Sequence, residues 1–82
     1  MRVKVRFFAL YRDRAGTSQV EVDLPEGATP KELVARLRNL FPSLSIDSSA
    51  FVAVNSEYAD REVPLLEGDE VVFIPPVSGG QT

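Results

Sequence analysis

The chain of 82 residues contains no cysteine and no histidine. Without cysteine it has no disulfide, no thiolate nucleophile and no cysteine-based zinc site. Without histidine it also lacks the commonest general base and metal ligand. Most catalytic constellations cannot be built from the remaining side chains. We therefore expect the chain to have no catalytic residue of its own, no metal site and no bound cofactor.

Long runs of charge are also missing. Nine Lys and Arg residues and twelve Asp and Glu residues are interspersed, giving a formal net charge of −3. Because no segment is polybasic, we expect neither nucleic acid nor an anionic membrane as a partner. The N-terminal "MRVKVRFFAL" alternates charged and apolar residues, which is typical of a strand and not of a signal peptide or a membrane span. We therefore expect a cytoplasmic protein.

The first quarter of the sequence predicts a β-hairpin. In residues 2–10, Val3, Val5 and Phe7 alternate with charged residues and should face the core, which leaves Phe8 as an aromatic side chain on the polar face. "RDRAGTS" is typical of a turn, and "QVEVDL" alternates again as a second strand. A chain of this size can bury one modest core, so we expect a single domain.

A helix is predicted after residue 29. Thr29 is the expected N-cap, Pro30 occupies the first helical position, and Glu32 completes a capping box. Pro42 should end the helix. Apolar residues at three- and four-residue spacing should pack on the sheet, namely Leu33, Val34, Leu37, Leu40 and Phe41.

The second half predicts further strands. "FVAVN" is a short strand followed by a turn at residues 55–57, Pro64 restricts the next segment to short edge pairing, and "VVFIP" is the last strand. The long crossover lets this strand return parallel to the first. This order predicts an α+β fold of the β-grasp, or ubiquitin-like, type, with a mixed sheet of four to five strands and one main helix on one face. We expect the domain to span residues 1–75, followed by a flexible tail at residues 76–82.

Several motifs now resemble a known family. "VRFFA", "AVN" and above all "GDEVVFIPPVSGG", which joins a turn, an apolar strand, a double proline and a double glycine, resemble the MoaD/ThiS family of sulfur carriers. The similarity covers nearly the whole chain. It is greatest to the MoaD branch, the small subunits of molybdopterin synthase, which serve molybdenum cofactor biosynthesis. A double glycine alone would be weak support, because glycine pairs are common in turns.

The resemblance implies a chemistry for Gly80. Its carboxylate would be adenylated by an E1-like enzyme of the MoeB type, which uses ATP, and then converted to a thiocarboxylate that donates sulfur within a complex with a large subunit of the MoaE type. Gln81 and Thr82 follow the second glycine, whereas family members normally end there. A peptidase that removes both residues is therefore an expected partner. The small subunit is expected to have no catalytic residue of its own, so it would be part of an enzyme only within this complex.

The tail and its docking surface can be predicted from spacing. The five residues from Pro76 to Gly80 reach roughly 16 Å when extended, enough to enter the active site of a partner. The part expected to enter is Val77, Ser78, Gly79 and Gly80. If Val71 and Phe73 face the core, then Val72 and Ile74 face outward. Phe8 should lie beside them, so Phe8, Val72 and Ile74 form the expected partner-docking patch.

Two other functions remain open on the sequence. The same activated terminus would serve a ubiquitin-like protein modifier that forms amide bonds with lysine side chains. A sulfur carrier could also supply another pathway, such as cysteine, thiamine or thiolated tRNA synthesis. A third, simpler interpretation is an adaptor whose tail has no chemical role.

Overall fold

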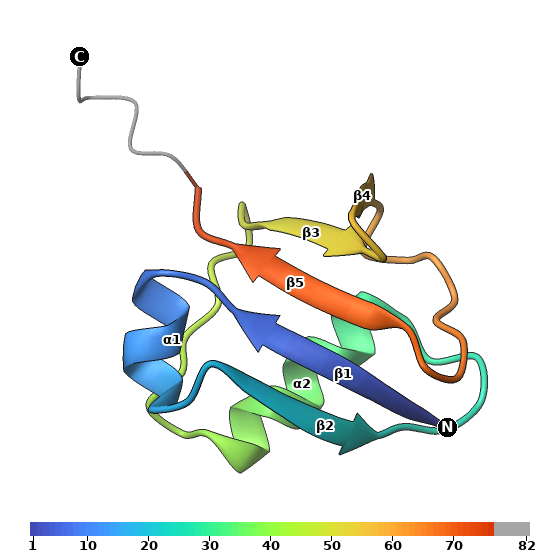
Figure 1. Ribbon diagram of the computed structural model, residues 1–82, viewed down its shortest axis with the longest axis horizontal. Coiled ribbons are helices and arrows are strands. Elements are labelled where there is room, and N and C mark those ends of the chain that lie inside the picture. The colour runs from blue at the N-terminus through green and yellow to red at the C-terminus, as the bar shows by residue number, and fades with distance from the viewer. Residues whose placement is uncertain (77–82) are drawn as a thin grey trace.

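The computed structural model describes residues 1–76, which form a five-stranded sheet and two helices (Figure 1). All the predicted tail residues from Val77 to Thr82 lie outside the described residues, and the predicted domain boundary after residue 75 stays a prediction. The elements, in chain order, are β1 (Arg2–Phe7), α1 (Leu10–Ala15), β2 (Gln19–Asp23), α2 (Pro30–Leu40), β3 (Phe51–Val54), β4 (Glu57–Ala59) and β5 (Glu70–Ile74).

The sheet has the predicted β-grasp topology. Its strand order is β2-β1-β5-β3-β4, so the last strand in the chain lies at the centre. β5 runs parallel to β1, with Val5 beside Val71, and antiparallel to β3. The other two pairings, β1 with β2 and β3 with β4, are also antiparallel. The predicted mixed sheet and the parallel return of the last strand are therefore confirmed.

α2 begins where the capping signals place it. The Glu32 backbone N–H donates to Thr29 Oγ1 at 3.4 Å, and the Thr29 backbone N–H donates to Glu32 Oε1 at 2.9 Å. This reciprocal pair satisfies two amide groups that have no acceptor within the helix. Pro30, at the first position, has no N–H to satisfy. The predicted capping box is therefore confirmed.

The core lies between α2 and one face of the sheet. Leu33 and Leu37 of α2 are fully buried against Val5, Val71 and Phe73 of the two central strands. Figure 1 shows α2 crossing behind the sheet, so no helix within residues 1–76 covers the other face. The helix and the alternating strands thus bury one set of side chains and expose the opposite set.

One member of the predicted helical stripe was assigned wrongly. Leu40 is 50% exposed, because the helix ends at this residue and the chain then turns away. Phe41, the residue that caps the helix C-terminus, is half-buried instead and packs edge-on against Phe7, with 5.7 Å between the ring centroids.

The predicted turn "RDRAGTS" was also wrong in its first half, where α1 forms. Tyr11 is completely buried, and its hydroxyl donates to Asp47 Oδ2 at 2.9 Å while accepting the Asp47 backbone N–H at 3.1 Å. Gly16 ends the helix in the left-handed conformation, with φ of 78°, and its N–H donates to the Arg12 carbonyl. Anchoring by Tyr11 therefore stabilises a helical turn that local sequence does not specify.

Candidate functional site

The face of the sheet opposite α2 carries a continuous row of paired residues. Arg6 of β1 lies beside Val72 of β5, Val72 beside Ala53 of β3, and Ala53 beside Tyr58 of β4. Directly paired residues point to the same side of a sheet. The row therefore changes from charged to apolar as it crosses from β1 to β4.

The half of this face formed by β1 and β2 carries ion pairs between the two strands. Arg2 Nε donates to Asp23 Oδ1 at 3.0 Å, and Arg2 Nη1 lies 3.6 Å from Glu21 Oε1. The hydrogen bond and positive charge of Arg2 lower the pKa of the Asp23 carboxyl below its usual value. All three side chains are exposed, so this half is a solvated surface of mixed charge.

The other half is apolar, and the three predicted docking residues lie on it. Phe8 is 56% exposed, and Val72 and Ile74 are half-buried, while their neighbours Val71 and Phe73 are fully buried. The predicted inward and outward orientations in β5 are therefore confirmed. One shallow hollow is lined by Phe8 and Val72, and a second by Val72 and Ile74. Val72 joins the two hollows into one surface.

Three further residues extend this surface, and the sequence analysis missed them. Phe51 and Tyr58 are 51% and 77% exposed, and their rings meet edge-on with 5.9 Å between centroids. Ala53 lies between Val72 and Tyr58. The signal was present, because the alternation in "FVAV" places Phe51 and Ala53 on one side. We call the whole set the apolar sheet face: Phe8, Phe51, Ala53, Tyr58, Val72 and Ile74.

A two-residue turn positions β4 within this surface. Asn55 and Ser56 both have positive φ, 53° and 74°, which suits the tight hairpin between β3 and β4. The Asn55 side chain donates to Asp69 Oδ1 at 2.9 Å and accepts the Glu70 N–H at 3.0 Å. Asp69 Oδ2 also accepts the N–H of Leu66 at 2.8 Å. These bonds fix the hairpin to the start of β5, and Asp69 stabilises the turn before β5.

Polar groups border the apolar sheet face on the side of β1. Arg6 Nη1 donates to Glu70 Oε2 at 3.3 Å across the two central strands. Arg12 of α1 lines the same hollow as Phe8 and Val72. A surface with an apolar centre and a charged border has the composition of a protein-docking site.

The end of β5 determines where the chain leaves the sheet relative to the apolar sheet face. β5 ends at Ile74 and is followed by Pro75 and Pro76, which cannot donate hydrogen bonds to a neighbouring strand. Figure 1 shows α1 at the same end of the sheet as the end of β5. The chain therefore leaves the domain next to Phe8 and α1, at the border of the apolar sheet face.

Residues 1–76 contain neither a helix that could span a membrane nor an acidic cluster that could hold a metal ion. No helix in this part of the chain is both long and apolar enough to cross a membrane. Acidic side chains in the same range do not gather in groups of three or more that could hold a metal ion.

These features define a ubiquitin-like β-grasp domain whose central strand leads into the C-terminal segment beside an exposed apolar surface. The chain belongs to the ThiS family, which its sequence matches over residues 5–80. It is 39% identical to the molybdopterin synthase sulfur carrier subunit of Chlamydomonas reinhardtii, across 98% of this chain and 100% of that relative.

Solved structures share the fold. Small archaeal modifier protein 1 of H. volcanii superposes with a TM-score of 0.83 at 25% identity, covering 93% of this chain and 98% of its own. A second match is one chain of the complex between subunits 1 and 2 of molybdopterin-converting factor from Helicobacter pylori. Its TM-score is 0.64 at 30% identity, over 98% of this chain and 100% of that one.

Proposed function

We propose that this protein is the sulfur carrier subunit of a molybdopterin synthase. The observation that carries the proposal is the extent of the family match, which runs to Gly80 and leaves out Gln81 and Thr82. The 39% identity to a molybdopterin synthase sulfur carrier subunit over almost the whole chain supports the same pathway. The double glycine is thus inside the shared sequence, and the last two residues are an addition to it.

In the proposed reaction, Gly80 supplies the reacting carbon. A carboxylate oxygen of Gly80 bonds to the α-phosphorus of ATP within an adenylating enzyme, and pyrophosphate leaves. A sulfur nucleophile then bonds to the carbonyl carbon, and AMP leaves with the former carboxylate oxygen. The carrier contributes a slim terminus without a Cβ and supplies no acid, base or metal ligand.

Gln81 and Thr82 must be removed before this reaction. While they are attached, the Gly80 carbonyl belongs to an amide, which has no carboxylate oxygen to attack phosphorus. A peptidase that cleaves after Gly80 is therefore part of the proposal. In its absence the protein would be an inactive precursor.

We assign docking to the apolar sheet face. Phe8 and Ile74 follow the paired residues Phe7 and Phe73 at the ends of β1 and β5, and Val72 lines a hollow with Phe8, so a partner that covers them also covers the end of β5. The Helicobacter pylori complex of two molybdopterin-converting factor subunits supports a large-subunit partner. We propose that an adenylating enzyme uses the same face. Because one surface can bind only one partner at a time, the two partners would bind in turn.

The decisive experiment compares the chain ending at Thr82 with a chain ending at Gly80. Each is incubated with the cognate adenylating enzyme, ATP and labelled pyrophosphate, and exchange of label into ATP is measured. We expect exchange only with the shortened chain. Mass spectrometry of that chain after addition of a sulfur donor should show one oxygen replaced by sulfur. Equal exchange from both chains without cleavage would refute the proposal.

A protein modifier is the second candidate, favoured by the structural similarity to small archaeal modifier protein 1. In that case the activated Gly80 forms an amide with lysine side chains and keeps no sulfur. Mass spectrometry of protein from its own cells separates the two functions. A modifier gives branched conjugates, and a carrier gives a thiocarboxylate. A carrier for cysteine, thiamine or tRNA thiolation would give the thiocarboxylate but fail to support molybdopterin formation in a reconstituted synthase.

A further inference from the structure

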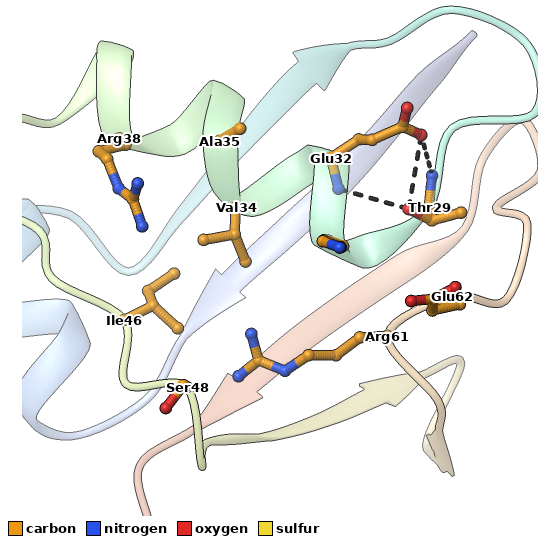
Figure 2. Close-up of a pocket in the computed structure, with 10 residues that line it drawn as sticks. Thr29, Glu32, Val34, Ala35, Arg38, Ile46, Ser48, Arg61 and Glu62 are labelled. Carbon is orange, nitrogen blue, oxygen red and sulfur yellow. Dashed lines mark hydrogen bonds between the residues drawn. The ribbon is translucent and has the colours of Figure 1, made fainter.

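A separate hollow lies on the helix side of the molecule, away from the two hollows of the apolar sheet face. It has a volume of about 620 Å³, within the range of about 300–1,000 Å³ typical of binding pockets. α2 and its N-cap form one wall, and residues 46, 48, 61 and 62 form the other (Figure 2). None of its lining residues belongs to a strand. It can therefore be occupied while a partner covers the sheet.

The hollow combines an apolar floor with cationic side chains. Val34, Ala35 and Ile46 supply the apolar surface, and Lys31, Arg38 and Arg61 supply three positive charges. Figure 2 shows the guanidinium groups of Arg38 and Arg61 directed toward the space around Ile46. This is a local excess of positive charge in a chain whose net charge is −3.

Acidic groups near the hollow offset only part of this charge. Glu32 and Glu62 are the two carboxylates of the lining, so three positive and two negative side chains leave an excess of one positive charge. The Glu32 carboxylate also accepts from the Thr29 N–H in the capping box. Glu62 lines the hollow, and Figure 2 shows it at the end away from Arg38. No ion pair within residues 1–76 involves a side chain of the three cations.

Arg61 is held in place by the loop before β3. Its Nη2 group donates to the Asp47 carbonyl at 2.8 Å and to the Ala50 carbonyl at 3.2 Å. Guanidinium carries five N–H donors, so donors on Nη1 and Nε are still available to a ligand. The positive charge is thus fixed beside the apolar floor before any ligand binds, which lowers the entropic cost of binding.

We propose that this hollow binds a short acidic segment of a partner protein. One carboxylate of that segment lies between Arg38 and Arg61, where charge-assisted hydrogen bonds form, and an apolar side chain covers Val34 and Ile46. The apolar floor favours an amphipathic peptide over a simple inorganic anion. Glu62 at the other end repels a second carboxylate and so sets the direction of the peptide. The site is independent of the sulfur chemistry, because it uses neither the tail nor the sheet face.

The test titrates the ¹⁵N-labelled full-length protein with the peptide acetyl-Leu-Asp-Glu-amide at low salt. We expect chemical-shift changes at the backbone amides of Val34, Ala35, Ile46 and Ser48, which diminish as salt is added. Arg38→Gln should weaken binding about tenfold, equivalent to about 1.4 kcal/mol. The matched control is Arg36→Gln, which removes the same charge from an α2 residue that does not line the hollow.

Four results with the peptides and variants would overturn the proposal, and a fifth with phosphate would do so as well. The first four are an absence of shifts at millimolar peptide, shifts confined to the strands, an equal loss of affinity in Arg36→Gln, and equal binding of acetyl-Leu-Lys-Lys-amide. Inorganic phosphate serves as a further probe. If it produces the same shifts with equal affinity, the hollow is a general anion site and the apolar floor has no role. Circular dichroism of each variant verifies that the fold is unchanged.

Discussion

Replacing Phe8 with serine tests the docking surface most directly, because Leu40→Ser provides a matched control. Phe8 is 56% exposed on the apolar sheet face, and Leu40 is 50% exposed at the end of α2. A phenylalanine side chain can bury roughly 200 Å². A partner that covers the exposed part of Phe8 therefore removes roughly 110 Å² from water, which is worth about 2.8 kcal/mol at about 25 cal/mol per Å².

This energy corresponds to an increase in Kd of up to about 100-fold for Phe8→Ser. The part of Phe8 already buried in the fold is roughly 90 Å², so the variant should lose about 2 kcal/mol of unfolding free energy and remain folded. Leu40→Ser should lose a similar or smaller amount of stability and keep the Kd of the original chain.

The measurement is isothermal titration calorimetry with the large molybdopterin synthase subunit, alongside urea unfolding of each variant. Comparing the two variants separates lost contact area from lost stability. An unchanged Kd for Phe8→Ser, or an equal rise for Leu40→Ser, would show that the apolar sheet face is not the docking surface.

Three other changes test the core, the anchor of α1 and the terminus. Leu37→Ala, at a fully buried position, should reduce the unfolding free energy by about 2–5 kcal/mol in urea titrations, and a loss below about 1 kcal/mol would contradict the packing of α2. Burial raises the pKa of Tyr11 above its usual 10.0, so the stability linked to this hydroxyl is complete below pH 10.0 and is lost as pH rises through the folded-state pKa. Tyr11→Phe should flatten that alkaline decline in unfolding free energy, and an unchanged decline in this variant would contradict the assignment. Gly80→Ala in a chain ending at residue 80 should leave the melting temperature unchanged and slow adenylation by about 100-fold, since a 1 Å misplacement of reacting groups has that effect. Unchanged adenylation would show that no enzyme requires the second glycine.

The sequence predicted those elements whose signals are local and repeated. Thr29, Pro30 and Glu32 mark the start of α2 unambiguously, because capping chemistry acts within a single turn. The alternation in β1 and β5 likewise fixes which side chains face the core. Together with the long crossover, these features were sufficient to predict the β-grasp.

α1 could not be predicted in the same way. A helix of six residues contributes little stability by itself, and Tyr11 is its single buried residue. The bond from Tyr11 to Asp47 spans 36 positions in sequence, so it is not visible in any local window. The same limit applies to Tyr58, whose place on the apolar sheet face depends on the register set by the hairpin turn at residues 55–56.

The central position of β5 has a mechanical consequence. If a partner draws the C-terminal segment into its active site, as proposed above, the pull on Ile74 acts along the direction of β5. β5 is hydrogen-bonded to β1 on one side and to β3 on the other, so the load is shared by two ladders under shear. An edge strand loaded across its pairing would instead separate one bond at a time. We therefore expect the sheet to stay intact under such a pull, so that the force reaches the docked surface first.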